Sequence, residues 1–542
     1  MFLTTGNPQE QYDFVVVGSG AAGLVAAVRV AQAGYSVAVL EKAAKLGGTS
    51  AAGGGVVWAP TNHLMKAHGY EDTRDNAVSY ISATTNGQVS HEDAGAFVDV
   101  VAQLVRFLDE DTHVDYLPLG RPDYHMHMTG AARGRGLDPQ PFDTGRLKGL
   151  TNVLRQPTYF PLITMSERDA LHGAAPDPEL LDARAEEGIR TMGGSLIGAL
   201  VLTAHETGVE FFTETPVLGI ESVGPSMWQV QTDRISLQSR QVLLSTGGFE
   251  WDEQLRQSLL KYPIQPISAP SNEGDGLRIG LKLGAGLAWT SAVWGVPVIS
   301  LSEHTYDGRQ VGRMGNVELT LPGSVMVNRR GKRFVNEAMN YHDLNKVFAS
   351  IDPHDQQLQN LPAWLIFDDE YLSRYSVCGK PAGQAPQGTI KANSLAELAE
   401  LIDVPKAAFL ETIERFNRFA REGVDVDFGR GDRPQDRHLG DPQQQPNPCL
   451  GELKRGPFYA LRIHAGVLGT AGGLKVDRNG RLLQHDGQPI AGVYAAGNCS
   501  ETVFKDAYPG GGATLASAMT RAYSVAGQVL ADLSHTTVSV EL

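Results

Sequence analysis

A glycine pattern near the amino terminus places the strongest constraint on how this chain can fold. The apolar run DFVVV at 13–17 leads into Gly18, Gly20 and Gly23, which form G-x-G-x-x-G, and the next segment, LVAAVRVAQAGY, has helical spacing. The first glycine allows a tight turn, the second lets backbone approach a pyrophosphate, and the third allows close helix–sheet packing. The pattern therefore predicts a Rossmann-type β-α-β unit that binds a dinucleotide.

The residues after this unit favour FAD over NAD. Glu41 ends the next apolar run, SVAVLEK, where a carboxylate can accept both ribose hydroxyls of an adenosine. The segment LGGTSAAGGG at 46–55 then supplies the close backbone approach that a large flat ring system needs. The alternative, that these glycines only make turns, fits so glycine-dense a segment less well.

Length and charge narrow the class of protein. A chain of 542 residues is too long for a single core, so two or more domains are expected. The net charge of −15 repels phosphate backbones, so we expect no nucleic-acid partner. The three cysteines, Cys378, Cys449 and Cys499, form no C-x-x-C pair, which fits a reducing cytoplasm better than a disulfide framework.

Targeting and membrane signals are weak. The first residues, MFLTTGNPQEQYD, lack the basic and apolar regions of a signal peptide, so we expect a cytoplasmic protein. The stretch MGGSLIGALVLTA at 192–204 is nearly continuously apolar but shorter than the ~20 residues that a span requires. It is predicted to be a buried helix, with weak membrane association or an apolar substrate channel as alternatives.

The strand-like segments fall into two groups. Those at 209–223, 241–248 and 492–498 resemble pieces of one sheet, whereas the stretch 296–464 carries strands of its own. We therefore predict an α/β protein with an inserted α+β domain. The polar segment 431–449 is expected to be a surface loop, its prolines excluding helix.

Several longer motifs resemble the flavoprotein family that includes fumarate reductases and 3-ketosteroid Δ1-dehydrogenases. They are VVVGSGAAG, LEKAAKLGGTSAAGGG, LLSTGGFE, SNEGDG, GVYAAGN and AYPGGGATLASAM, and they run from residue 13 to about residue 525. The resemblance implies a glutathione-reductase-like FAD-binding domain, interrupted by a smaller catalytic domain. The expected boundaries are 1–295 and 465–542 for the FAD-binding domain and 296–464 for the catalytic domain.

The motifs and the resemblance together assign a set of residues to the cofactor. The succinate- and fumarate-converting members carry a histidine before the paired glycines, where this chain has GTAGGL, and members with covalent flavin have a histidine where this chain has Thr49. FAD is therefore expected to bind without a covalent link. The expected cofactor-binding residues are Gly18, Ser19, Gly20, Ala21, Ala22, Gly23, Glu41, Lys42, Gly48, Thr49, Ser50, Ala52, Gly53, Gly54, Val217, Thr246, Gly247, Gly248, Asp275, Gly497, Asn498, Thr514 and Leu515.

Further segments resemble the ketosteroid dehydrogenase branch in particular, including VVWAPTNHL, GKRFVNEAMNY, PAWLIFD and GDPQQQPNPCLGE. The four groups that do the chemistry in that branch fall on Tyr124, Tyr341, Tyr508 and Gly512. The resemblance implies that Tyr508 and the Gly512 N–H polarise a ketone, in the manner of an oxyanion hole. Tyr341 would take the α proton, Tyr124 would assist it, and flavin N5 would accept the β hydride.

The substrate stays open between two ring sizes. The main prediction is a 3-ketosteroid Δ1-dehydrogenase with an unidentified electron acceptor, and the alternative is a desaturase of a smaller cyclic ketone, such as cyclohexanone or 4-oxocyclohexanecarboxylate. The segment HMHMTGAAR after Tyr124 departs from the aromatic pattern expected of a steroid enzyme, and Lys505 and Asp506 would suit a more polar ketone. A third hypothesis is a fumarate-reductase-like ene reductase, but that reaction needs an arginine as proton donor, and the matched segments do not provide one.

A metal site is not expected. His125 and His127 could place two imidazoles on one face of a strand, but no third ligand is evident in the nearby sequence.

Overall fold

The computed structural model describes residues 8–538, so residues 1–7, which hold much of the segment inspected for a signal peptide, lie outside the described residues. A parallel sheet with strand order β22-β11-β1-β2-β8 forms the centre of one half of the molecule. The carboxyl-terminal parts of β1, β2 and β11 are buried on both faces, which explains the apolar runs that mark them in the sequence. The strand bounds are β1 Gln11–Val17, β2 Val37–Leu40, β8 Glu210–Phe212, β11 Ser236–Leu244 and β22 Pro489–Ala495.

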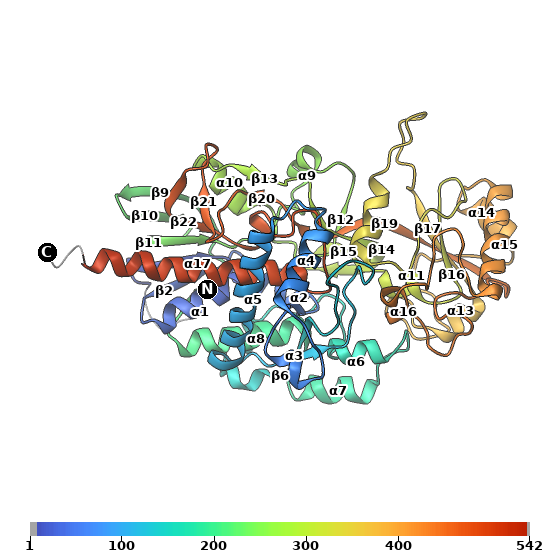
Figure 1. Cartoon of the computed structure of the whole chain (residues 1–542), viewed down its shortest axis with the longest axis horizontal. Helices are drawn as coiled ribbons and strands as arrows, with labels where there is room; N and C mark the ends of the chain where they lie inside the picture. The colour runs from blue at the N-terminus through green and yellow to red at the C-terminus, as the bar shows by residue number, and fades with distance from the viewer. Residues whose placement is uncertain (1–7, 539–542) are drawn as a thin grey trace.

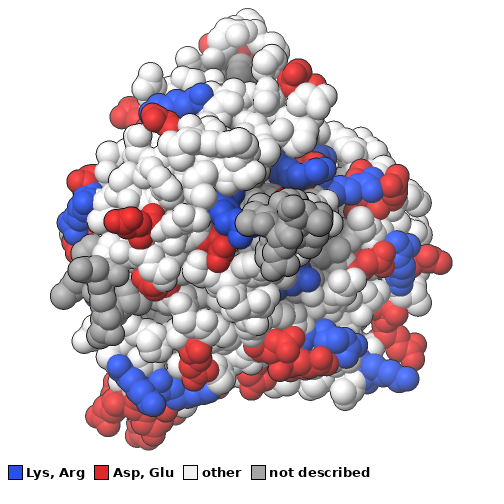
Figure 2. Space-filling view, turned by 90° about the vertical axis from the view of Figure 1, so that its left-hand side faces the viewer, with Lys and Arg blue, Asp and Glu red and all other residues white. Residues whose placement is uncertain are grey.

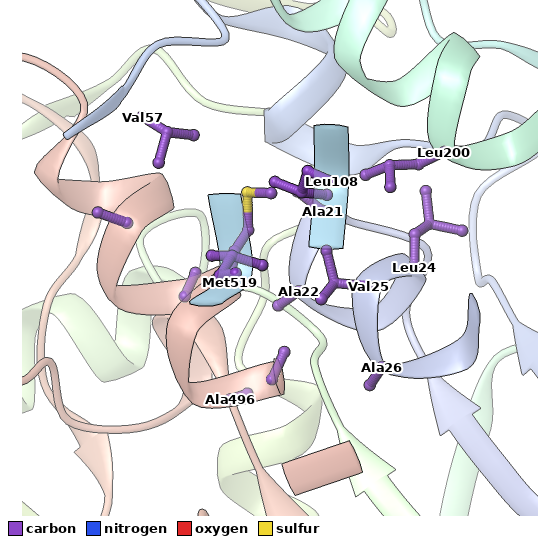
Figure 3. Close-up of a cluster of buried hydrophobic side chains, with 14 of the residues drawn as sticks. Ala21, Ala22, Leu24, Val25, Ala26, Val57, Leu108, Leu200, Ala496 and Met519 are labelled. Carbon is purple, nitrogen blue, oxygen red and sulfur yellow. The ribbon is translucent and has the colours of Figure 1, made fainter. Parts of the chain in front are cut away.

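Helices cover this sheet closely. Helix α1 (Ala21–Gln32) follows the glycine motif, and α17 (Ala513–Val538), at the opposite end of the chain, packs along it. Figure 3 shows small side chains of α1, among them Ala21 and Ala22, in one cluster with Met519 of α17. Alanines at these positions allow the two helices to approach closely, and this joins the first and last segments of the chain in one core.

Three antiparallel strands extend the parallel sheet. Strand β10 (Met227–Thr232) pairs with β11 and with β9 (Val217–Gly224), while β21 (Arg481–Leu483) pairs with β22. The predicted strand segment at 209–223 therefore contains two strands, β8 and β9, which are separated by a bend at Thr213 and Glu214. Figure 2 views this end of the molecule and shows basic side chains in small groups among acidic ones.

A second sheet occupies the other half of the molecule (Figure 1). Its order is β15-β14-β19-β17-β16, with β12 and β18 also pairing with β19. Strand β19 ends at Thr470, whose backbone N–H donates to Glu250, a residue just after β11 of the first sheet. The bounds are β12 Gln265–Pro266, β14 Val293–Tyr306, β15 Arg309–Met314, β16 Ser324–Asn328, β17 Ala363–Asp368, β18 Ile390–Ala392 and β19 Phe458–Thr470.

Helices flank both sheets, and three short strands form an antiparallel sheet of their own, in the order β3-β5-β4. Their bounds are β3 Val57–Trp58, β4 Tyr116–Leu119 and β5 Gly136–Pro139. The first half carries α2 Gly48–Ala52, α3 Leu64–Ala67, α4 Arg74–Thr84, α5 His91–Asp111, α6 Met165–Ala170, α7 Pro178–Glu186, α8 Met192–Glu206, α9 Glu253–Leu259 and α10 Asp275–Lys282. The second sheet is flanked by α11 Asn316–Thr320, α12 Tyr341–Lys346, α13 Asp369–Arg374, α14 Leu395–Leu401, α15 Lys406–Glu422 and α16 Pro434–His438.

The mixed α/β architecture agrees with the predicted fold class. The strands β14 and β19 extend slightly beyond both ends of the predicted inserted segment, 296–464, and β12 joins the same sheet from before it. The exact domain boundaries therefore stay a prediction.

Two segments test the sequence reasoning directly. The apolar stretch 192–204 is a buried helix, α8, as expected, and no helix within residues 8–538 is long and apolar enough to cross a membrane. The expectation that prolines exclude helix from 431–449 is wrong, because Pro434 is the first residue of α16. Proline is tolerated there since the first helical N–H has no partner within the helix.

Candidate active site

A long cleft lies at the carboxyl ends of β1, β2 and β11 and reaches to the second sheet. Its empty volume, including the part open to solvent, is about 2180 Å³. The structure brings most of the predicted site residues to its wall, namely Gly18, Ser19, Gly20, Ala21, Ala22, Glu41, Lys42, Gly48, Thr49, Ser50, Gly53, Gly54, Tyr124, Val217, Thr246, Gly247, Asp275, Tyr341, Gly497, Asn498, Tyr508, Gly512, Thr514 and Leu515.

Three predicted residues, Gly23, Ala52 and Gly248, do not line the cleft. A Cβ on Gly23 would stand 2.3 Å from the carbonyl oxygen of Gly18, so this glycine serves the packing of α1 on the sheet. Ala52 is buried, and a Cβ on Gly248 would meet the Oγ1 of Thr470 at 2.2 Å. These three positions support the wall from behind.

The nucleotide end of the cleft is built around Glu41. Its Oε2 accepts hydrogen bonds from the backbone N–H of Ser19 at 3.1 Å and from the Ser19 hydroxyl at 2.6 Å. Nearby, the N-cap of α1 is Gly20, which supplies no side-chain cap. The Ala21 N–H donates to the Ser50 hydroxyl at 3.1 Å, and the helix terminus offers its other N–H groups and its partial positive charge to a pyrophosphate.

Lys42 and Asp275 lie at the same end and neutralise each other. The Lys42 ammonium donates to Asp275 at 2.7 Å and to Glu273 at 2.8 Å. This cation is therefore already paired within the protein.

Thr49 is held by hydrogen bonds in the middle of the cleft. Its Oγ1 accepts from the backbone N–H of Ala269 at 3.0 Å and from the side-chain amide of Asn272 at 2.8 Å. That amide also donates to Glu250, a carboxyl buried behind the wall whose pKa is raised by burial. A threonine hydroxyl held in this way is not a nucleophile toward a flavin methyl group.

Three tyrosines meet at the far end of the cleft. The Tyr341 hydroxyl donates to the oxygen of Tyr508 at 3.1 Å. The ring of Tyr124 lies 5.5 Å from each of the other two, edge-on to Tyr341 and stacked on Tyr508. The three predicted tyrosines therefore form one cluster, although neighbouring members are more than 150 positions apart in the sequence.

The loop before α17 holds Tyr508 and Gly512 in place. Gly512 has a φ of +101°, and a Cβ there would meet the carbonyl oxygen of Val56 at 2.6 Å. Its carbonyl accepts from the Trp58 N–H, and the Pro509 carbonyl accepts from the Tyr80 hydroxyl at 2.6 Å. Only glycine fits position 512, where the backbone N–H lies close enough to Tyr508 to lower the pKa of its hydroxyl.

Burial keeps all three phenols protonated. It raises the pKa of Tyr508 and of Tyr341 well above the ordinary value, and it raises that of Tyr124 as well. The positive charge of Arg121 acts in the opposite direction on Tyr124 and Tyr341. A protonated Tyr508 suits a hydrogen-bond donor, whereas Tyr341 needs help to act as a base.

Arg121 is one of several residues that sequence reasoning missed. Its Nη1 lies 3.7 Å from where a Cβ of Gly511 would stand, next to the tyrosine cluster. Its guanidinium pairs with Asp169 through two hydrogen bonds, and the His438 ring lies 3.1 Å from the same carboxylate. Burial raises the pKa of Asp169, but Arg121 and His438 outweigh it and hold that pKa below its usual range.

Other missed residues also line this end. Arg168 of α6 and Gln435 and His438 of α16 belong to it, together with the apolar side chains of Phe160, Met165, Met314, Met339, Leu439 and Leu468. No motif marks these positions, since distant loops bring them together.

Two further groups do not join the site. His125 pairs with Asp343 at 2.6 Å, and within residues 8–538 no group of three or more potential ligands could hold a metal ion. Lys505 pairs with Glu501 at 2.8 Å, and neither Lys505 nor Asp506 lines the cleft. The expectation that these two charges favour a polar ketone stays a prediction, and the residues that line the cleft give it no support.

The cleft as a whole fits FAD. It combines an uncapped helix terminus, a buried carboxylate at the ribose position and a glycine-rich wall between them. Beyond this wall lies the tyrosine cluster, where a ring substrate would meet the reactive part of the cofactor.

Comparisons with known proteins agree with this geometry. A family described as FAD binding domain matches residues 13–515. The 4-oxocyclohexanecarboxylate 2-dehydrogenase of Sinomonas cyclohexanicum is 40% identical over 98% of this chain and 95% of its own length. The 3-oxosteroid 1-dehydrogenase of Mycolicibacterium smegmatis is 36% identical over 98% of this chain and 99% of its own.

A solved structure is similar throughout. The 3-ketosteroid Δ1-dehydrogenase of Sterolibacterium denitrificans, in complex with 1,4-androstadiene-3,17-dione, has a TM-score of 0.89 and 31% sequence identity, covering 97% of this chain and all of that one. The chain therefore belongs to the FAD binding domain family, in its 3-ketosteroid Δ1-dehydrogenase branch, and is an FAD-dependent oxidoreductase that acts on CH–CH groups.

Proposed function

We propose that this enzyme desaturates a cyclic ketone at the carbons next to its carbonyl group. The observation that carries the proposal is the meeting of Tyr508, Tyr341 and the Gly512 N–H at one end of the cleft. We take 1–295 with 465–542 as the domain that holds FAD and 296–464 as the inserted catalytic domain.

Two donors would polarise the ketone. The Tyr508 hydroxyl and the Gly512 N–H, which lies close to it, would both donate to the carbonyl oxygen, and the phenol stays protonated because it is buried. Hydrogen bonds there stabilise the negative charge that develops on the oxygen when the α proton leaves. This stabilisation makes an otherwise weakly acidic C–H group reactive.

Tyr341 would receive the α proton. In the resting protein its hydroxyl donates to Tyr508, so it must pass its own proton on as it accepts another. Tyr124, in ring contact with Tyr341, would share that proton, and the positive charge of Arg121 stabilises the phenolate form of both. The geometry thus supports a shared base instead of a single tyrosine.

FAD, when bound, supplies the acceptor for the β hydride. The residues that would hold it are those around Glu41, the α1 terminus and the 46–55 loop. Thr49 supports non-covalent attachment, because its hydroxyl already accepts two hydrogen bonds. The cytoplasmic location, the electron acceptor and any weak membrane association stay predictions.

Relatives of both ring sizes support this reaction. The names of the two relatives given above describe dehydrogenation of a steroid ketone in one case and of a single-ring ketone in the other. Both substrates would use the same four groups, so the proposal covers a 3-ketosteroid and a smaller cyclic ketone. The charged side chains that line the cleft would favour one of these two substrates over the other.

The test is turnover of candidate ketones by purified holoprotein with an artificial electron acceptor. We expect dye reduction and a product that has lost two hydrogens beside the carbonyl. For the variant Tyr508→Phe, Tyr371→Phe is a matched control, because Tyr371 is also buried but lies in the core of the second sheet. Absence of turnover with cyclohexanone-type and steroid ketones alike, or reduction of fumarate by the reduced protein, would overturn the proposal.

A further inference from the structure

The strongest unexplained feature of the cleft is the side chain of Arg168. It extends from α6 and lines the cleft at the end that holds the tyrosine cluster. Within residues 8–538 no carboxylate forms an ion pair with it, and its one side-chain hydrogen bond is a long contact of 3.7 Å to the sulfur of Met165. The negative charges of Asp169 and Glu318 act on it from beyond contact distance, but neither carboxylate pairs with it directly.

The other charged side chains that line this end have ion-pair partners within the protein. Arg121 is paired with Asp169, and Asp123 is paired with Arg135 at 2.6 Å. His438 also lies against Asp169. Among the described residues, Arg168 is therefore the charged side chain that lines this end of the cleft without an ion-pair partner.

Apolar side chains lie next to the guanidinium of Arg168. The guanidinium lies 5.8 Å from the centre of the Phe160 ring and next to Met165. Burial, and then the neighbouring charge of Arg121, lower the pKa of Arg168. A partly exposed guanidinium in such a place gains from an anionic partner through charge-assisted hydrogen bonds.

We propose that Arg168 binds a carboxylate carried by the substrate, so that the substrate class is a ring ketone with a carboxylate group. This inference rests on the proposed function, because it concerns the same cleft. A neutral steroid would leave the guanidinium facing an apolar ring system, whereas a carboxylate on a single ring would satisfy it. The planar fork of arginine binds a carboxylate through two hydrogen bonds.

Matched substrates test the proposal. Initial rates are measured for 4-oxocyclohexanecarboxylate and for its methyl ester, which keeps the ring and ketone but loses the charge. In the wild-type holoprotein we expect kcat/KM to favour the acid, and in Arg168→Gln we expect that preference to fall roughly 10- to 100-fold, as for the loss of a charged hydrogen bond. An unchanged preference in Arg168→Gln would overturn the assignment.

Arg313→Gln is the matched control. The Arg313 guanidinium lies 4.6 Å from the centre of the Tyr159 ring, beside Phe160, but it does not line the cleft. We expect this variant to keep the wild-type preference and both variants to keep their bound FAD. Loss of FAD from Arg168→Gln, or loss of the preference in Arg313→Gln alone, would contradict the proposal.

Binding without turnover separates this inference from the proposed function. In Tyr341→Phe holoprotein, the flavin absorbance is titrated with 4-oxocyclohexanecarboxylate, with and without the Arg168→Gln change. A Kd that rises with Arg168→Gln supports the carboxylate site even if no variant turns over a ketone. Equal Kd values in a protein that does turn over ketones would refute the site and leave the reaction standing.

Discussion

Replacing Tyr508 with phenylalanine removes one oxygen atom from the centre of the proposed site. The ring contacts survive, because the Trp294 ring lies 5.1 Å away and the Tyr124 ring 5.5 Å away. What is lost is the donor to the ketone and the acceptor for Tyr341. The Gly512 N–H remains, so polarisation of the carbonyl is weakened without being abolished.

The magnitude follows from these contacts. Loss of one of two oxyanion donors lowers kcat by about 10²- to 10³-fold. The Tyr341 hydroxyl loses one hydrogen-bond partner but keeps its interaction with Tyr124, so the loss costs about 1 kcal/mol of stability and leaves the protein folded. The assay compares kcat with a saturating ketone, together with the FAD content of each protein. A kcat for Tyr508→Phe close to that of wild type, at equal FAD content, would refute the role assigned to this hydroxyl.

Three further predictions concern charge and attachment. The rate should rise with pH through the alkaline range, because Tyr341 must lose a proton and its pKa is raised. Arg121→Gln should move this rise to higher pH, because the charge of Arg121 lowers the pKa of Tyr341, and Arg121→Lys should restore the wild-type profile. The measurement is the pH profile of kcat/KM for each protein. Acid precipitation should release the flavin into the supernatant, and a yellow pellet would argue for a covalent link. Arg135→Met should destabilise the protein by about 3–5 kcal/mol, because it leaves two buried carboxylates unpaired, whereas Arg478→Gln at an exposed pair should leave thermal unfolding unchanged.

The parts of the site that are local in sequence could be predicted from it. The turn at Gly18 and Gly20, with Glu41 at the end of the next strand, forms one contiguous β-α-β unit whose spacing reports its geometry. The tyrosines and Gly512 came from a resemblance to motifs, and the structure places them in one cluster.

The remaining parts depend on contacts that sequence spacing does not report. Asp169 meets His438 across 269 positions, and nothing in either segment marks the pair. The helix that carries His438 was missed because Pro434 was interpreted as a helix breaker, although proline fits the first turn. Arg168 is equally unmarked, since its significance lies in the absence of a partner and emerges only from the packed structure.

The most direct test of the central claim is anaerobic mixing of the oxidised, yellow holoprotein with a cyclic ketone that carries deuterium at its β carbons. Flavin bleaching is followed by stopped flow, and the product is identified by mass spectrometry. We predict that the flavin bleaches as the α,β-unsaturated ketone forms, and that it bleaches more slowly with the deuterated ketone than with the unlabelled one. A flavin that stays oxidised with single-ring and steroid ketones alike would contradict the claim.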